Sequence, residues 1–563
     1  MDNEISTRLT WDEIPLESIK RNKENKAFKM AVIDAETDPF DGENFVSPFI
    51  WGFFDGENYM EFDGPYATEN MVDVVSKFKG SVYAHNGGKF DFHFIIDYLE
   101  KEKALTVING RIAKAKMGKA TMRDSYCILP VPLSALEKDQ FDYSILKKGK
   151  RELAENKIKI SEYLKSDCLY LHKYVKEFTD TYGVNLTLAA TALKQWGELG
   201  GKVPRSDKMY YDKFLPHYYG GRVEPFKSGI FEGDYKIYDI KSAYPTAMQF
   251  EHPIGTDYYE TRKPCDSQLP NALLTVDCKS DGAFPMRTKE GLYFPREKGI
   301  YHITGWEFIK AVETGTISNH KILNAYVFTE TCSFKQYVDH FYAMKSEADF
   351  QLSIAKTDTE KSFWGARRTF AKLFLNSLYG KFAANPQNYE EFYLDEYGAF
   401  PKNGFAPGPL YKDMQLFSRD LPEDKWKFYN VVTAASITGW VRAYLWESIQ
   451  RCQEVLYCDT DSIICRNGDA LPMGKDLGNW DLEGQAHKVA IAGKKLYACF
   501  GDFGKGKTTK IACKGVRLSA AEIERVAKGE TVIYRSEAES FSLKSGKRFI
   551  ERKVNPTGKT FLK

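Results

Sequence analysis

The sequence element that most restricts the fold is an Asp-Thr-Asp triplet held between two apolar runs. Within Val455–Cys465, apolar arms flank Asp459 and Asp461. Short apolar arms around a tight polar turn predict a β-hairpin whose tip carries both carboxylates on one face. Like charges this close repel each other, and burial would raise the pKa of one carboxyl unless a cation lay between them. The triplet therefore predicts a divalent-cation site rather than a solvated turn.

A further carboxylate is expected at the end of an earlier strand. The run Tyr235–Ile240 is typical of a β-strand that ends near Asp239, and Pro245 is expected to stop the chain from extending it. Asp239 and Tyr244 should therefore lie at the strand end, where a ligand can reach them.

A helix predicted over about 361–379 carries cations and an aromatic side chain on one face. Its apolar spacing indicates the helix, and steps of three or four residues align the polar positions ahead of Gly380, which suits a helix end. Such a face fits a nucleoside triphosphate and its base, although an amphipathic helix with a solvated basic face would show the same pattern. The aligned residues are Arg368, Lys372, Asn376 and Tyr379.

Four acids and a phenol in the first 170 residues form another group. Asp34 and Glu36 lie two residues apart on a predicted strand, so both point the same way. Asp91 follows an Asn-Gly-Gly turn, and Tyr163 and Asp167 share one face of a helix predicted over 155–178. Each motif alone has a simpler structural explanation. Together they can hold two divalent ions about 3.5–4 Å apart and orient a water for phosphodiester hydrolysis.

Composition excludes several classes of protein. With 563 residues, 43% hydrophobic and 28% charged, the chain is expected to be soluble and to form several domains. Lys and Arg number 79 against 77 Asp and Glu, which excludes a polycation or an acidic disordered chain but not a nucleic-acid-binding protein. Residues 501–563 hold 15 Lys and Arg against 7 Asp and Glu, so a basic tail suited to a nucleic-acid backbone is predicted.

Cysteine usage and hydropathy predict a location. The ten cysteines include no Cys-x-x-Cys pair, which argues against a zinc ribbon and for reduced thiols. No signal-peptide pattern opens the chain, and no apolar run approaches the roughly 20 residues of a membrane helix. We therefore expect a cytoplasmic location and no membrane partner.

One motif is predicted to be a chance match. Gly501–Thr508 fits the Gly-x(4)-Gly-Lys-Thr pattern of a phosphate-binding loop, which needs a helix directly after it. The following residues, Thr508–Cys513, are typical of a strand instead. An ATPase is therefore rejected, although the lysines of this turn could touch DNA backbone.

In chain order, these groups resemble the motifs of family B DNA polymerases. Asp-x-Glu, Asn-x(2–4)-Phe-Asp and Tyr-x(3)-Asp resemble the DEDD-type 3′–5′ proofreading exonuclease, and Asp-x(2)-Ser-x-Tyr-Pro, Lys-x(3)-Asn-Ser-x-Tyr-Gly and Tyr-x-Asp-Thr-Asp-Ser resemble polymerase motifs A, B and C. Tyr218–Gly221 and Lys495–Tyr497 are similar to the Tyr-x-Gly-Gly and Lys-x-Tyr motifs of the protein-primed branch. The resemblance covers about residues 30–515, and the blocks most like the polymerases of tectivirus-type phages are His85–Phe92, Asp124–Pro132 and Tyr457–Cys465.

For the exonuclease, the resemblance implies two divalent ions, Mg²⁺ or Mn²⁺, and a water positioned by Tyr163. The implied metal ligands are Asp34, Glu36, Asp91 and Asp167. The residues implied to contact the single-stranded 3′ end are Thr37, Asn86, Phe90 and Ser125.

For the polymerase, the resemblance implies a second pair of ions held by Asp239 and Asp461, with Asp459 beside them. Tyr244 is implied to block a ribose 2′-OH, and Tyr379 to pack on the nascent base pair. The residues implied to hold the incoming dNTP are Lys372, Asn376 and Arg368. Those implied to contact DNA are Tyr218, Gly220, Gly221, Ser242, Thr438, Arg442, Lys495 and Tyr497.

The implied fold class is a multidomain α/β and α+β protein: an RNase H-like exonuclease domain plus a right-hand polymerase with terminal-protein-region insertions. The predicted segments are an N-terminal arm (1–28), an exonuclease domain (29–198) and a polymerase domain (199–563). Within the last we expect the palm at about 215–250 and 429–500, insertion 1 at 251–345, fingers at 346–382, insertion 2 at 383–428 and the thumb at 501–563. The insertions are matched by position alone.

Three hypotheses follow. The favoured one is a monomeric DNA-directed DNA polymerase that replicates a linear phage or plasmid genome, primed by a terminal protein, with proofreading and strand displacement. The second keeps the enzyme but makes priming conventional or primer-independent. The third, a non-catalytic nucleic-acid-binding module, is opposed by acids at every motif position.

Overall fold

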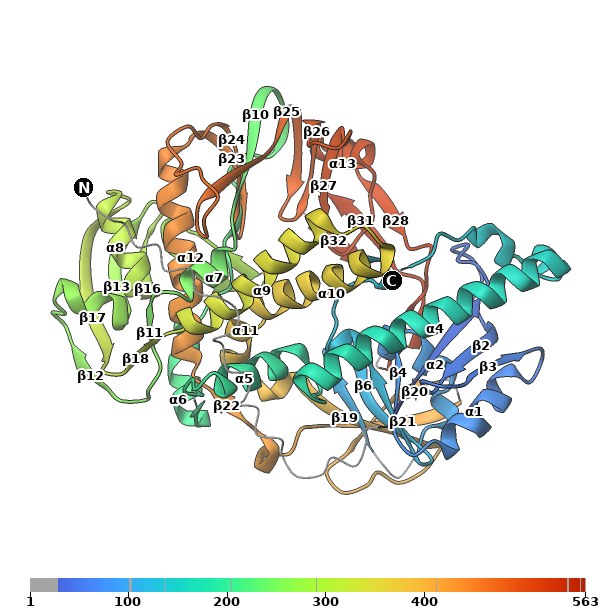
Figure 1. Cartoon of the computed structure of the whole chain (residues 1–563). Helices are drawn as coiled ribbons and strands as arrows, with labels where there is room; N and C mark the ends of the chain where they lie inside the picture. The colour runs from blue at the N-terminus through green and yellow to red at the C-terminus, as the bar shows by residue number, and fades with distance from the viewer. Residues whose placement is uncertain are drawn as a thin grey trace, which may run out of the picture.

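The computed structural model (Figure 1) describes residues 29–561 apart from 101–103, 137, 204, 290, 412, 544–545 and 557. The predicted N-terminal arm, residues 1–28, lies outside the described residues. The described chain combines large sheets with long helices, as the predicted α/β and α+β class requires.

The first sheet is built from the N-terminal part of the chain. Strand β1 is an inner strand, parallel to β4 on one side and antiparallel to β2 on the other, and β4 is parallel to β7. Its N-terminal strands are β1 (Met30–Thr37), β2 (Pro48–Phe54), β3 (Tyr59–Asp63), β4 (Ser81–Ala84), β5 (Leu105–Ile108), β6 (Arg111–Met117) and β7 (Ala120–Asp124). The helices of this part are α1 (Ala67–Lys77), α2 (Asp91–Phe94), α3 (Lys148–Arg151), α4 (Ala154–Tyr182) and α5 (Leu188–Glu198).

Both faces of β1 are covered by other elements, and the alternation of side chains along the strand decides which way its acids point. Ala31 and Ile33 join the core beneath α1, whereas Met30 and Val32 join the core that includes Leu171 of α4. Because side chains alternate along a strand, Asp34 and Glu36 continue the row that begins with Met30 and Val32 and so face α4. The close approach of α4 requires Gly52 on β2, where an added Cβ would lie 2.8 Å from the Cys168 sulfur.

A segment distant in sequence extends this sheet. Strands β19 (Tyr389–Glu396), β20 (Ala406–Tyr411) and β21 (Met414–Asp420) pair with one another, and β19 pairs with β5 through Phe392 and Leu105. The described strands of the sheet then run β20-β21-β19-β5-β6-β7-β4-β1-β2-β3. The predicted insertion 2 therefore packs as part of the first sheet, on the side opposite to β3.

The second sheet carries the Asp-Thr-Asp hairpin. Strands β23 (Gln453–Asp459) and β24 (Ser462–Asn467) pair antiparallel around a two-residue turn, which confirms the predicted hairpin. The described strands run β27-β26-β25-β10-β24-β23-β9. The remaining members are β9 (Val223–Pro225), β10 (Gly229–Ile240), β25 (Trp480–Gly493), β26 (Leu496–Asp502) and β27 (Thr509–Cys513).

Two sequence expectations in this sheet have clear outcomes. β10 ends at Ile240, as expected for Tyr235–Ile240, but Pro245 does not simply end a strand: it lies inside the short helix α7 (Ala243–Ala247), which follows Ser242 in a left-handed conformation. The Gly501–Thr508 stretch is the β26–β27 turn with no helix after it, which confirms that it is not a phosphate-binding loop.

Three helices and a smaller sheet complete the central part. Helices α9 (Lys335–Ile354) and α10 (Asp358–Leu375) lie side by side, and α12 (Val431–Arg451) runs between the second sheet and the smaller one (Figure 1). The smaller sheet, with helix α8 (Gly305–Glu313) packed on it, comprises β12 (Tyr258–Thr261), β17 (Ile317–Phe328), β13 (Ala272–Ser280) and β16 (Lys298–Thr304).

The helix predicted over 361–379 is interrupted. It begins at Asp358, where Thr357 and Glu360 form a capping box, and ends at Leu375. Asn376 then leaves the helical conformation and its side-chain amide donates to the Lys372 carbonyl (2.9 Å). The chain resumes as α11 (Leu378–Phe382), so Tyr379 lies on a separate helix from Lys372.

The C-terminal part packs on β25 and β26 and then returns to the first sheet. Helix α13 (Ala520–Ala527) and strands β28 (Val532–Arg535), β31 (Glu551–Asn555) and β32 (Gly558–Phe561) form the outer layer. The backbone amides of Gly42 and Val46 donate to Glu537 and Glu539 (both 3.1 Å). Within the described residues, no helix is both long and apolar enough to cross a membrane.

Candidate active sites

The first acidic site forms where β1 faces α4. Oxygen atoms of Asp34, Glu36 and Asp167 lie within 4.8 Å of one another, the only such group of three possible metal ligands in the described part of the chain. Asp91 is the first residue of helix α2 and is 3% exposed, and the negative charge of Asp34 helps to raise its pKa. The structure therefore brings the four predicted acids of this site together.

Burial makes these carboxylates hard to ionise in the absence of a cation. Burial first, and the negative charge of Asp167 second, raise the pKa of Asp34 to about 7. Burial and the neighbouring carboxylates also hold the pKa values of Glu36 and Asp91 well above their ordinary range. Without a bound cation, the site therefore lacks the positive charge needed to keep all of these carboxylates ionised.

The donor set fits hard divalent cations. Oδ1 of Asp167 is buried and has no hydrogen-bond partner among the described residues, whereas its Oδ2 lies 3.2 Å from Nζ of Lys138. Carboxylate oxygens with no other partner are the ligands that Mg²⁺ and Mn²⁺ prefer. We therefore regard Asp34, Glu36, Asp91 and Asp167 as the residues that would hold such ions.

Tyr163 is fixed beside this site by residues that the sequence did not single out. Its hydroxyl lies 2.8 Å from that of Tyr143, and its ring stacks on Phe141 with centroids 4.0 Å apart. Lys138 and Phe141 belong to the loop before α3, and Tyr143 begins a short 3-10 helix that follows this loop. No motif spacing marks such a segment, so a search for acids and helix faces misses it.

The residues predicted to contact a single-stranded 3′ end have mixed positions. Phe90 is half-buried in an aromatic group with Phe40 and Phe541, at centroid distances of 5.9 and 5.6 Å. Asn86 has a left-handed φ of 63°, and its side-chain oxygen accepts from Arg111 (2.8 Å). Both are partly exposed, and their contact with a strand end stays a prediction.

Two other predicted contacts are less accessible. Thr37 is 7% exposed and its hydroxyl donates to the Asp38 carbonyl (3.1 Å). Ser125 is completely buried, with its hydroxyl 3.0 Å from Nδ1 of His85. The prediction that Ser125 touches DNA is therefore wrong for this structure; it orients the loop that follows β4.

The second acidic site forms at one end of the second sheet. Asp239 on β10 pairs in register with Ser462, and the Ile240 amide donates to the Asp461 carbonyl (2.7 Å). Burial and the charge of Asp461 raise the pKa of Asp239 to about 7, and burial and Asp459 raise that of Asp461 to about 6. The hairpin and β10 therefore bring their acids together, as predicted.

Two further charges enter this site. Glu483 on β25 adds its negative charge to both Asp239 and Asp461 and is paired with Lys510. The Nζ of Lys495 lies 2.5 Å from Oδ1 of Asp459, so this carboxylate already has a cationic partner. Glu483 lies outside every short motif, because only the antiparallel pairing of β10 and β25 brings it here.

The predicted nucleotide-binding residues form two groups. The rings of Tyr244 and Tyr379 are stacked, 4.1 Å apart at 7°, and Tyr244 feels the charge of Asp461. On α10, Lys372 is exposed, as are Asn376 at its end and Arg368, which pairs with Asp349 of α9 (2.5 Å). Arg368 and Lys372 therefore share an exposed face of α10, as predicted, whereas Asn376 lies beyond the last helical residue and Tyr379 lies on α11.

The predicted DNA-contacting residues of the second part also divide. Tyr218, Gly220, Gly221, Ser242 and Lys495 are at least partly exposed, whereas Tyr497 is 5% exposed and packs on Tyr457.

Thr438 and Arg442 cannot meet DNA directly in this structure, because they are 1% and 2% exposed. Arg442 makes a bidentate ion pair with Glu307 (2.8 and 3.0 Å) and donates to the carbonyls of Tyr219 (2.6 Å) and Gly220 (3.0 Å). The expected direct contact is therefore corrected to a supporting role under the Tyr218–Gly221 segment.

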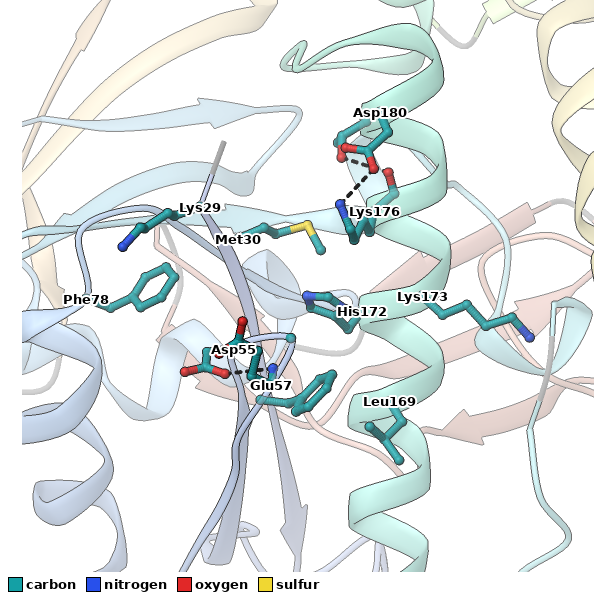
Figure 2. Close-up of a pocket in the computed structure, with 13 residues that line it drawn as sticks. Lys29, Met30, Asp55, Glu57, Phe78, Leu169, His172, Lys173, Lys176 and Asp180 are labelled. Carbon is teal, nitrogen blue, oxygen red and sulfur yellow. Dashed lines mark hydrogen bonds and ion pairs between the residues drawn. The ribbon is translucent and has the colours of Figure 1, made fainter. Parts of the chain in front are cut away.

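A cavity of about 630 Å³ lies elsewhere, along α4 beyond Asp167 (Figure 2). It is lined by charges of both signs, and Lys176 and Asp180 are paired across 2.7 Å. The charged side chains at its wall are Lys29, Lys173, Lys176, Asp55, Glu57 and Asp180. None of the predicted site residues lines it, so the chemistry is marked by the two acidic groups and not by this cavity.

Comparisons with known proteins agree with this geometry. Residues 137–420 match the family model "DNA polymerase type B, organellar and viral". The DNA-directed DNA polymerase of Enterobacteria phage PRD1 is 36% identical over 96% of this chain and all of its own length. The DNA polymerase of Bacillus phage phi29 is 26% identical over 80% of this chain and 83% of its own.

The fold is also that of a solved polymerase. Phi29 DNA polymerase in a ternary complex with primer-template DNA and incoming nucleotide superimposes with a TM-score of 0.70 at 18% identity, over 94% of this chain and all of the other. Its orthorhombic crystal form gives 0.69. The predicted fold class, an RNase H-like exonuclease domain with a right-hand polymerase, is thereby confirmed. The chain therefore belongs to the organellar and viral group of family B DNA polymerases, as a DNA-directed DNA polymerase of the phage PRD1 and phi29 type.

Proposed function

We propose that the chain performs two phosphoryl-transfer reactions at separate sites: template-directed DNA synthesis at Asp239, Asp459 and Asp461, and 3′–5′ removal of nucleotides at the site on β1 and α4. The observation that supports this most strongly is the presence of two buried acid groups on two different sheets, each with carboxyl pKa values raised by burial and like charge.

At the first site the chain's own residues orient a water and hold the strand end. Tyr163, fixed by Tyr143 and Phe141, lies on α4 one turn before Asp167 and is the group that would position the attacking water. Phe90 offers a ring to a terminal base, and Lys138 supplies positive charge beside Asp167.

At the second site the primer 3′-hydroxyl would attack the α-phosphate of a dNTP, with pyrophosphate as the leaving group. The exposed Lys372 and Arg368 would bind the triphosphate, together with Asn376. The stacked rings of Tyr244 and Tyr379 would form the wall beneath the nucleotide. Tyr244 would exclude a ribose 2′-hydroxyl, and Tyr379 would pack on the nascent base pair.

We propose Mg²⁺ as the usual ion, with Mn²⁺ as a substitute, and two ions per site. When bound, such ions stabilise the attacking and leaving oxygens of an in-line displacement. The buried carboxylates described above are the ligands that support this assignment.

The proposed partners are a primer-template duplex, the four dNTPs and a terminal protein that supplies the first hydroxyl, with the polymerase acting as a monomer. Solved phi29 polymerase complexes contain primer-template DNA and nucleotides, which supports the first two. We propose that the segments 251–345 and 383–428 bind the terminal protein and encircle the template, giving processivity with strand displacement. The alternative is the same enzyme with conventional or primer-independent initiation.

An adduct assay separates these alternatives. The purified enzyme is given each labelled dNTP in turn, with and without its candidate terminal protein, and products are resolved on a denaturing gel. Protein priming predicts a covalent protein–nucleotide adduct only when the terminal protein is present, and none with the Asp239→Asn variant. Extension of a DNA oligonucleotide primer without any adduct would support the alternative.

A further inference from the structure

Arg222, which no motif includes, lies directly before β9, and its charged side chain is deeply buried, at 1% exposure. Its guanidinium carbon lies 4.0 Å from the Phe294 ring centre and 4.2 Å from the Trp446 ring centre. It donates to the Gly282 carbonyl (2.8 Å) and is paired with Glu224. Stacking, hydrogen bonding and charge pairing together leave this side chain a single position.

The backbone of the same residue contacts the Asp459-Thr460-Asp461 turn. The Arg222 carbonyl accepts a hydrogen bond from the Thr460 amide (2.6 Å), and β9 pairs with β23 so that Val223 lies opposite Asp459. Gly221 is in close contact, because an added Cβ there would lie 2.7 Å from Cγ2 of Thr460. Gly221 and the Arg222–Val223 peptide therefore shape one side of the turn.

The turn needs such support. Thr460 has a φ of 62°, in the left-handed region that a β-branched residue rarely occupies, and such a strained conformation persists only when its surroundings impose it. The contact with Arg222 supplies that constraint from outside the hairpin. If the turn relaxed, Asp459 and Asp461 would move with respect to Asp239.

We infer that Arg222 is a positioning residue for the polymerase site, which fixes Gly221 and the Arg222–Val223 peptide and so holds the left-handed turn between Asp459 and Asp461. Its anchors Gly282 and Phe294 belong to the segment 251–345. The network therefore also connects that segment to the carboxylates. This role rests on the proposed function of the Asp239, Asp459 and Asp461 site.

The test compares Arg222→Met and Arg222→Lys with Arg296→Gln. Arg296 also pairs with Glu224 (3.3 Å), but its side chain is 49% exposed and this pairing does not reach the turn, so it is the matched control. Two quantities are measured: the Mg²⁺ concentration for half-maximal primer extension, and the amide hydrogen exchange of a peptide spanning 455–465 in the metal-free protein. Single-strand degradation by the same chain is the internal reference.

Arg222→Met should raise the half-saturating Mg²⁺ concentration about tenfold, as loss of an outer-shell support does, and should speed exchange of the 455–465 peptide. Single-strand degradation should stay within about twofold. Arg222→Lys keeps the charge but loses the planar fork, so it should show a smaller shift in the same direction and decides the matter if the Met variant does not fold. Arg296→Gln should match the wild type.

Unchanged Mg²⁺ dependence and exchange in the Arg222 variants would overturn the inference. A parallel fall of synthesis and degradation at unchanged Mg²⁺ dependence would also overturn it, because that pattern indicates general destabilisation. Failure of the proposed function would look different: the wild type itself would not extend a primer, whereas the exchange of the turn would still respond to Arg222.

Discussion

Replacing Asp34 by Asn should stabilise the metal-free protein at neutral pH. The pKa of Asp34 is about 7 in the folded protein against an ordinary value of 3.8, so the folded state binds this proton more tightly than the unfolded state does. The stability that results is complete below pH 3.8 and is lost as the pH rises toward 7. A difference of about three pH units corresponds to at most about 4 kcal/mol.

The asparagine side chain of the variant has nearly the same shape and no charge, so the variant should lack this loss. In EDTA, we expect the variant to be up to about 4 kcal/mol more stable than the wild type at pH 8 and no more stable at pH 4. Because Asp167 contributes to the shift, proton uptake by neighbouring acids will reduce the measured gain. Adding Mg²⁺ at pH 8 should stabilise the wild type and have a smaller effect on the variant.

The assay is urea unfolding followed by tryptophan fluorescence at pH 4, 6 and 8. Asp73→Asn is the matched control, because Asp73 lies on α1 of the same part of the molecule with its side chain 67% exposed and should change stability by about 0.5 kcal/mol or less. A variant with the same pH dependence as the wild type would refute the reasoning, and so would a metal-free wild type that is most stable at pH 8.

Three other predictions concern single positions and the C-terminal charge. Tyr163→Phe should slow single-strand degradation about tenfold to a hundredfold and leave primer extension unchanged, since only the hydroxyl paired with Tyr143 is lost; equal rates on a labelled oligonucleotide would contradict this. Gly221→Ala should reduce primer extension more than tenfold, because its Cβ would press on Thr460. The control Gly365→Ala, whose Cβ meets nothing within 4 Å, should leave extension unchanged. Equal extension by both variants would contradict this prediction. DNA affinity measured by fluorescence anisotropy should fall about a thousandfold between 50 and 200 mM salt, given the excess of Lys and Arg in residues 501–563, and a flat salt dependence would rule out backbone contacts by that segment.

The acid groups could be predicted from the sequence because each depends on short-range geometry. Asp34 and Glu36 share a strand face, and Asp459 and Asp461 share a hairpin tip, which period and turn chemistry alone specify. The sequence order of the motifs then indicated which elements meet. The structure agrees on all of these placements.

Other features depend on tertiary contacts that no local pattern encodes. From the sequence, Arg442 is predicted to bind DNA. In the structure it forms a buried ion pair with the carboxylate of Glu307, which lies 135 residues away in the chain. Glu483 reaches the second acidic site because β25 pairs with β10, and β19 joins β5 across more than 280 residues of chain. The helix break at Asn376 follows from one side-chain hydrogen bond that competes with the helix, which apolar periodicity does not register.

The central claim is that one chain holds two independent acidic sites, one for synthesis and one for degradation. The most direct measurement follows a labelled primer on a template, with and without dNTPs, for Asp239→Asn combined with Asp461→Asn and for Asp34→Asn combined with Glu36→Gln. The account predicts that the first pair abolishes extension but preserves trimming of the primer, and that the second pair abolishes trimming but preserves extension. Loss of both activities in either pair, with the protein still folded, would contradict it.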